Sequence, residues 1–347
     1  MPLPAPATTL HALLGSALDA AEIDRLLDQL QVAPALLRPA LAQANRAEIA
    51  QALNMLLFHG LLERVPTAAD CVAERRANGA KVCFDHGALR TVAWPSGALP
   101  PGQAAITRVL LPLGFEQAET YPLPRLRMTG RAWRHRDLPQ DIAQFFVSEL
   151  HPDAFSGEFQ AAVSRVIGTS RDPLSAQDLA ELAQLGRDGV LPLATAQRLL
   201  PRLAACFERQ HGLFEWADYE LLRAESAEMA WIATEGNAFN HATDRVRDID
   251  AVVALQQAAG RPVKSSVEVS ASGRVKQTAL AAAAVERAFL HQGSVLTRSV
   301  PGSFYEFIER APLPGQAGQP QLDLAFDAAN ATGIFGMTRE SVTERAR

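Results

Sequence analysis

Two histidines occupy matching places in two short stretches of the sequence. FDHGALR at Phe84–Arg90 aligns with FNHATDR at Phe239–Arg245, so each stretch reads Phe, Asp or Asn, His, three residues and Arg. Both stretches are predicted as strands, in which alternate side chains share a face, so the Phe, His and Arg of each are expected on one surface. A core histidine bonded to backbone would explain one such strand, but the repeat favours His86 and His241 as ligands of one metal ion.

A carboxylate suited to the same ion stands in FYEFIER, at Phe304–Arg310. On a strand Glu306 lies between two large apolar side chains, where a carboxylate normally needs a cation, whereas Glu309 faces the other way and is interpreted as a solvated charge. Two histidines and one carboxylate from separate strands form the facial triad that binds non-heme Fe(II) and leaves positions open for substrate and dioxygen. The predicted cofactor is therefore Fe(II), although Zn, Ni, Mn or Co also suit His86, His241 and Glu306.

The first repeat has no second carboxylate of this kind. Its last strand is predicted at Gln144–Leu150, where FFV aligns with the FYE that contains Glu306. That alignment places Val147 at the position of Glu306, and valine cannot bind a metal. One complete site per chain is expected.

Several polar residues are candidates for contact with a substrate. Arg90 shares a strand face with His86 and not with Asp85, so a substrate carboxylate is its expected partner, whereas Arg245 is interpreted as structural. The stretch VEVSASGRVKQ at 267–277 is most simply a hairpin whose serines and glutamine could line the cleft. The predicted catalytic residues beyond the metal ligands are Arg90 and Gln277, and the predicted substrate contacts are Arg90, Ser270, Ser272 and Gln277.

The elements that must position these residues also repeat. A strand, a helix and three strands are predicted in the first half, and the same order follows the second histidine stretch, which indicates a duplication. The predicted class is α+β, with two such modules forming a curved sheet around a metal cleft. The predicted boundaries are 1–78 for an N-terminal helical cap, 79–152 for the first module, 153–236 for a helical insertion, 237–312 for the second module and 313–347 for a C-terminal tail.

The composition excludes several classes of protein. The 347 residues are 48% hydrophobic and 20% charged, which is typical of a globular chain. A net charge of -5 means that the chain lacks the excess positive charge expected of a protein that binds nucleic acid. Three scattered cysteines, the absence of a signal-peptide pattern and the absence of a long apolar run predict a cytoplasmic protein without a membrane segment. No G-x-G-x-x-G before a helix, Walker loop or G-x-S-x-G occurs, so nucleotide-binding and serine-hydrolase functions lose their main support.

With these motifs the chain resembles the vicinal oxygen chelate superfamily, whose modules place metal ligands on their first and last strands. Five blocks, 84–90, 144–151, 240–246, 272–278 and 301–310, together resemble the 2-oxoadipate dioxygenase/decarboxylase family. The resemblance spans about residues 80 to 310. It implies that His86, His241 and Glu306 bind Fe(II), that Arg90 binds a carboxylate of a 2-oxo acid, and that 2-oxoadipate and dioxygen yield 2-hydroxyglutarate and carbon dioxide in lysine catabolism.

Two other functions fit the same pattern of residues. A glyoxalase-like lyase or isomerase would use Zn²⁺ or Ni²⁺ at the same ligands and would not need dioxygen. A metal-free protein on the same fold would sequester a small acid, and its affinity would survive His86→Ala. A 2-oxo acid other than 2-oxoadipate is also compatible with the sequence, which assigns no oligomeric state.

Overall fold

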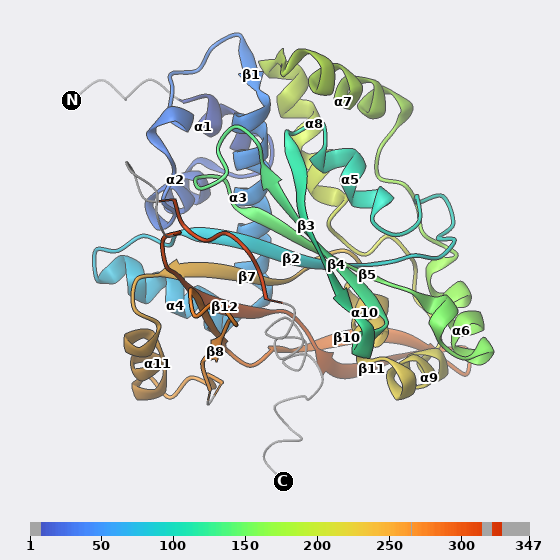
Figure 1. Cartoon of the computed structure of the whole chain (residues 1–347). Coiled ribbons are helices and arrows are strands. Elements are labelled where there is room, and N and C mark those ends of the chain that lie inside the picture. The colour runs from blue at the N-terminus through green and yellow to red at the C-terminus, as the bar shows by residue number, and fades with distance from the viewer. Residues whose placement is uncertain (1–7, 265, 314–320, 328–347) are drawn as a thin grey trace.

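A curved sheet of eight strands runs through the middle of the molecule (Figure 1). The structure is a computed structural model that describes residues 8–264, 266–313 and 321–327. Its sheet is built from β2 (Phe84–Val92), β3 (Phe115–Leu123), β4 (Met128–His135), β5 (Gln144–Leu150), β7 (Phe239–Val246), β8 (Glu268–Val269), β9 (Val275–Ala279) and β12 (Phe304–Arg310). The strand order is β3-β4-β5-β2-β7-β12-β9-β8, with β2 and β7 antiparallel at the centre.

The two halves of this sheet repeat one another. From the centre outward the first half runs β2-β5-β4-β3 and the second runs β7-β12-β9-β8, and each central strand pairs in parallel with the last strand of its own half. A helix follows each central strand, α5 (Ala104–Leu110) in the first half and α11 (Ile249–Ala258) in the second. The predicted α+β class and the duplicated strand–helix–three-strand module are confirmed.

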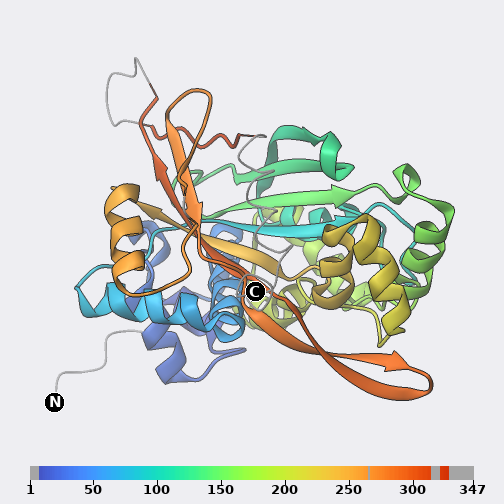
Figure 2. The ribbon, with the colours of Figure 1, turned by 90° about the horizontal axis from the view of Figure 1, so that it is seen from below.

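The second module carries an insertion that the sequence analysis missed. Strands β10 (Ala284–His291) and β11 (Ser294–Pro301) pair with each other as a hairpin that projects from the body (Figure 2). Residues 284–301 therefore add two strands outside the predicted order of one strand, a helix and three strands, and β8 of the module sheet has only two residues. Residue types typical of strands give no information about the pairing partner, which explains why the hairpin was not predicted.

Helices cover the sheet in two groups, before β2 and between β5 and β7. They are α1 (Thr9–Leu14), α2 (Ala20–Gln29), α3 (Arg46–Arg64), α4 (Pro66–Ala77), α6 (Gly157–Ile167), α7 (Ala176–Asp188), α8 (Leu193–Ala205), α9 (Trp216–Glu225) and α10 (Ala227–Glu235). The groups meet, because β1 (Gln43–Asn45) pairs with β6 (Val190–Pro192) and because α1 and α3 contact α8. Among the described residues, no helix combines the length and apolar character needed to cross a membrane.

The longest helix fixes which face of the sheet is core. Helix α3 begins at a capping box, in which Asn45 accepts a hydrogen bond from the Glu48 backbone and the Glu48 carboxylate accepts one from Asn45. It contacts β7, and its apolar side chains share one core with Phe145, Val147 and Phe307. The neighbouring residues of those strands, on the opposite face, are left to line a cleft.

Candidate metal centre

Three side chains from three strands converge on the cleft face of the sheet. His86 comes from β2, His241 from β7 and Glu306 from β12, and one ligand atom from each lies within 4.8 Å of the others. The Nε2 atoms of His86 and His241 lie 3.2 Å and 3.3 Å from Oε2 of Glu306. All three are buried, with only 1% of Glu306 exposed. The structure thus brings the three predicted ligands together.

A bulge in each central strand aims the two imidazoles. Where β2 and β7 pair, Asp85 and Asn240 are each an extra residue without a partner across the ladder. Nδ1 of His86 lies 2.8 Å from the Asp85 carboxylate, and Nδ1 of His241 lies 3.0 Å from the Asn240 amide. Each histidine is therefore held at Nδ1 by the preceding residue, which leaves Nε2 free to face Glu306.

The bulges correct the predicted face assignment. Strict alternation put Phe84 and Phe239 on the histidine face and Asp85 on the other. Instead Phe239 lies in the core beneath the sheet, and the Phe84 ring lies 5.1 Å from that of Phe58 in α3. A bulge shifts the alternation by one residue, so the aromatic rings turn to the core and Asp85 turns to His86. The repeated Asp or Asn before each histidine was the signal that could have identified these orienting residues.

Asp85 is balanced by a buried arginine from β12. The guanidinium of Arg310 donates to both carboxylate oxygens of Asp85, with its Nε 2.9 Å from Oδ2 and its second terminal nitrogen 2.9 Å from Oδ1. Burial alone would raise the pKa of Asp85, but Arg310 and His86 outweigh burial and hold that pKa well below its ordinary range. Asp85 is therefore a charged partner of His86, and it raises the pKa of that imidazole against the effect of burial.

Glu306 is a carboxylate whose surroundings suit a cation. Burial raises the pKa of Glu306, but the neighbouring His241 and His86 lower it by more than burial raises it. The net pKa is therefore well below the ordinary value. The hydroxyl of Thr243 donates to Glu306 and lies 3.1 Å from Nε2 of His86. An ionised carboxylate and two imidazole nitrogens on one buried surface are the donor set of a 2-His-1-carboxylate site, so the residues fit a divalent metal ion.

The corresponding position in the first module is held by an aromatic ring. In the second module Glu306 pairs with Thr243. The residue equivalent to Thr243 in the first module is Ala88, and Ala88 pairs with Phe146 of β5, so Phe146 is equivalent to Glu306. The sequence alignment that placed Val147 there was one residue out, because Val147 faces the α3 core. The conclusion that this position offers no metal ligand holds, since phenylalanine cannot bind one.

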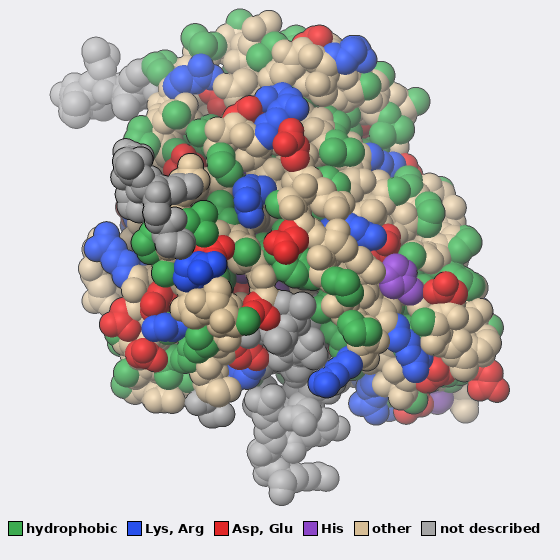
Figure 3. Space-filling view, viewed as in Figure 1, with side chains coloured by type: hydrophobic (Ala, Val, Ile, Leu, Met, Phe, Trp, Pro, Cys, Tyr) green, Lys and Arg blue, Asp and Glu red, His purple; other side chains and the backbone are tan. Residues whose placement is uncertain are grey.

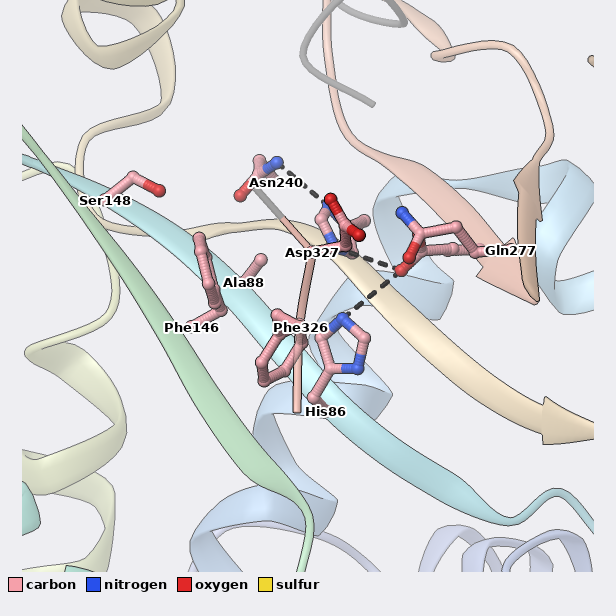
Figure 4. A pocket seen from close by; sticks show the side chains of 10 residues that line it. His86, Ala88, Phe146, Ser148, Asn240, Gln277, Phe326 and Asp327 are labelled. Atoms are coloured by element: carbon pink, nitrogen blue, oxygen red, sulfur yellow. Dashed lines mark hydrogen bonds and ion pairs between the residues drawn. The ribbon is translucent and has the colours of Figure 1, made fainter. Parts of the chain in front are cut away.

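Ten residues line the pocket around the three ligands. They come from both modules and from the segment after β12: His86, Ala88, Phe146, Ser148, Asn240, His241, Gln277, Glu306, Phe326 and Asp327. Gln277, predicted as a substrate contact, is among them and reaches the pocket from β9 (Figure 4). Phe326 and Asp327 were not predicted, because nothing in the predicted C-terminal tail, 313–347, points to the cleft. Tail residues other than 313 and 321–327 lie outside the described residues.

The other predicted substrate contacts lie beside this pocket or away from it. Arg90 is fully buried on the His86 face, paired with the pocket residue Ser148 across to β5, and its guanidinium carbon lies 4.9 Å from the Trp231 ring centre. Ser270 and Ser272 face each other at 3.1 Å within the turn between β8 and β9. That turn is the predicted hairpin. Neither serine is among the pocket-lining residues described above.

One face of the molecule is mixed in charge. On the face shown in Figure 3, basic and acidic side chains of the described residues are interspersed.

Arg245, interpreted from the sequence as structural, donates to the Cys83 sulfur and to the Gln140 carbonyl. The three cysteines are free thiols.

Sequence comparison gives a family match over most of the chain. The family model described as 2-oxoadipate dioxygenase/decarboxylase matches residues 46–344. A curated relative from rice (Oryza sativa subsp. japonica), named 2-oxoadipate dioxygenase/decarboxylase, chloroplastic/amyloplastic, is 24% identical over 317 residues, which is 82% of this chain and 78% of the relative.

Solved structures share the fold. A protein assigned to the glyoxalase superfamily from Ralstonia eutropha JMP134 is 54% identical, with a TM-score of 0.87 over 92% of this chain and 98% of the other. Hydroxyglutarate synthase from Oryza sativa, solved in complex with 2-oxoadipate, is 22% identical, with a TM-score of 0.68 over 91% and 99% of the two chains. At the lower identity the likeness concerns the fold alone.

Proposed function

Since the chain belongs to the 2-oxoadipate dioxygenase/decarboxylase family, we propose that it converts 2-oxoadipate and dioxygen to 2-hydroxyglutarate and carbon dioxide at an Fe(II) ion held by His86, His241 and Glu306. The observation that carries the proposal is the convergence of two imidazole nitrogens and one carboxylate oxygen within 4.8 Å in a buried pocket. The rice hydroxyglutarate synthase of the same fold was solved with 2-oxoadipate, which supports this substrate.

The residues of the chain prepare the site in three ways. When bound, Fe(II) would supply chelation of the 2-oxo acid and reaction with dioxygen. Asp85 and Asn240 hold the two imidazoles so that Nε2 faces the ion. Phe146 and Phe326, whose ring centres lie 4.8 Å apart, line the pocket with apolar surface, and a bound substrate with less water around it would make stronger electrostatic contacts there.

Two residues are proposed to hold the substrate. Gln277 lines the pocket from β9 and offers an amide to an oxygen of the 2-oxo acid. Arg90 lies beyond Ala88 on the same strand face and is proposed to attract a substrate carboxylate from the end of the pocket near Ser148. Ser270 and Ser272 are left out of the proposed substrate contacts, because they bond within their own turn.

Oxygen uptake tests the proposal. Protein loaded anaerobically with Fe(II) and mixed with 2-oxoadipate should consume one dioxygen for each carbon dioxide released, and 2-hydroxyglutarate should accumulate. His86→Ala should abolish uptake, whereas His291→Ala, on the exposed end of β10, should leave it unchanged. Absence of uptake with Fe(II) bound would reject the dioxygenase.

The same experiment separates the alternative functions. Turnover of a 2-oxo compound with Zn²⁺ or Ni²⁺ in the absence of dioxygen would indicate the lyase or isomerase. Binding of the acid by His86→Ala, with no metal and no turnover, would indicate the metal-free binding protein. We place the proposed reaction in cytoplasmic lysine catabolism, while the rice relative is by name a plastid protein.

A further inference from the structure

The segment after β12 forms a wall of the metal pocket. Phe326 packs edge-on against His86 with ring centres 4.8 Å apart, and Asp327 lines the same pocket (Figure 4). The Phe326 amide donates to the hydroxyl of Tyr121 at 2.9 Å, and Asp327 accepts from the Ala271 amide at 2.9 Å. Residues 323–327, which we call the strap, thus lie across the cleft between β3 and the turn between β8 and β9.

One arginine fastens the strap and the metal site together. On one side, the guanidinium of Arg310 donates to Asp85, the partner of His86 Nδ1. On the other side, its remaining nitrogen donates to the carbonyl oxygens of Asp323 and Ala325 in the strap, both at 2.8 Å. Because a guanidinium is a rigid planar fork, a shift of the strap would pull on Asp85, and a shift of Asp85 would loosen the strap.

Burial makes these contacts costly to break. The side chains of Arg310 and Asp85 are almost wholly inaccessible to solvent. A buried charge that loses its partner destabilises a protein strongly, so the charged pair and the two strap carbonyls favour a single arrangement. The Arg310 guanidinium also lies 5.3 Å from the Phe326 ring centre, which adds a cation–π contact to the strap.

We propose that Arg310 is a positioning residue that couples the orientation of His86 to the seating of the strap. Metal binding at His86, His241 and Glu306 then favours the closed strap, and the closed strap favours metal binding by the same factor, as linkage requires. The inference rests on the metal site of the proposed function but not on its reaction.

Hydrogen exchange with Co(II) as the probe tests the coupling. In the full-length protein, saturating Co(II) should slow exchange of the strap amides at least about fivefold, because these amides exchange when the strap opens. Arg310→Lys keeps the charge but loses the fork, so Co(II) should bind about 10- to 100-fold more weakly and should no longer slow exchange in the strap. Equal protection in the wild type and Arg310→Lys would overturn the proposal, as would unchanged Co(II) affinity.

A matched control contacts the same strap from the turn between β8 and β9. Arg274 pairs with the Asp323 carboxylate at 2.8 Å and does not contact Asp85. Arg274→Lys should leave Co(II) affinity within about twofold and keep the protection. Loss of Co(II) affinity in this variant equal to that of Arg310→Lys would contradict a specific role for Arg310.

A second variant covers the case in which Arg310→Lys fails to fold. Phe326→Ala removes a strap contact without removing a metal ligand, and it should weaken Co(II) binding at least about fivefold. Unchanged Co(II) affinity would overturn the coupling. Neither hydrogen exchange nor Co(II) affinity requires turnover. An inactive protein that shows the coupling would therefore reject the proposed reaction alone. An active protein without the coupling would reject the strap proposal alone.

Discussion

The two modules share a backbone plan and differ at the few positions that decide function. Both have a histidine after a bulge on the central strand, and both histidines point Nε2 into the cleft. In the second module the neighbouring cleft positions carry Thr243 and Glu306, and in the first they carry Ala88 and Phe146. Duplication therefore supplies the geometry twice, while one residue per half determines which half carries the proposed acidic ligand.

The orienting groups differ in charge as well. Asp85 in the first module is ionised and paired with Arg310, whereas Asn240 in the second is a neutral amide. The ion pair gives the first histidine a more basic environment, which agrees with a raised pKa for His86 and a lowered pKa for His241, where burial dominates. The two proposed histidine ligands, although equivalent by position, are thus held by partners of different charge.

The largest effect is expected from removing the acidic ligand. Glu306→Gln keeps the shape of the side chain but loses its charge, so affinity for Fe(II) or Co(II) should fall by at least about 100-fold. Isothermal titration measures the loss. The control is Glu309→Gln on the other face of β12, where the carboxylate accepts from the Ile249 amide and pairs with Lys276. Similar losses in both variants would contradict the assignment of the ligand.

A smaller and unequal effect is expected from the two orienting residues. Asp85→Ala removes a charged partner of His86 and should weaken metal binding about 100-fold, and Asn240→Ala removes a neutral partner of His241 and should weaken it about tenfold. The same titration compares them, with thermal unfolding as a check on folding. Equal losses would show that the charge on Asp85 has no effect on the ligand.

A transplant tests whether the two halves are equivalent. In the double variant Phe146→Glu with Glu306→Ala, the carboxylate moves to the matching position of the first module, next to the same two histidines. Metal affinity should recover about tenfold over Glu306→Ala alone. The reason is that the duplication relates the position of Phe146 to that of Glu306, so a carboxylate there also faces the two histidines. No recovery in a folded protein would show that the modules are equivalent in backbone only.

The last effect concerns stability rather than metal binding, at a core position where the modules also differ. Asp244 stands where the first module has Leu89, and burial raises the pKa of its carboxyl to about 7 although Arg75 lies 3.2 Å away. Between about pH 4 and pH 7 the unfolded chain has lost this proton and the folded chain retains it, so this group's contribution to stability falls as pH rises.

Asp244→Asn removes that dependence and keeps an acceptor for the Cys83 amide. The free energy of unfolding of the variant minus that of the wild type should increase by roughly 2–4 kcal/mol as the pH rises from 5 to 8. Urea unfolding at the two values measures it. A difference between the two proteins that is constant with pH would mean that Asp244 is ionised throughout, as the partner of Arg75.

Sequence patterns predicted the parts of this molecule that depend on local order. The repeated FDHGALR and FNHATDR stretches, with Glu306 in FYEFIER, were sufficient for the module plan and for the three residues that converge. Periodicity failed at the bulges, because an extra residue reverses the faces, and this hid Asp85 and misplaced Phe84 and Phe239.

Other features depend on contacts between distant segments and leave no local signal. The role of Arg310 requires knowing that β12 lies near Asp85, 225 residues away in the chain. Phe326 and Asp327 line the pocket only because the chain turns back over the cleft after β12. The register of β5 against β2 decides whether Val147 or Phe146 occupies the position equivalent to Glu306. That register is set by strand pairing, and a sequence alignment that is uncertain by one residue cannot determine it.

Anomalous X-ray diffraction at the iron edge, from crystals loaded anaerobically with Fe(II), tests the central claim most directly. The account predicts one strong peak per chain at about 2.0–2.3 Å from Nε2 of His86, Nε2 of His241 and a carboxylate oxygen of Glu306. A peak bound elsewhere, or none at full Fe(II) occupancy in solution, would contradict it.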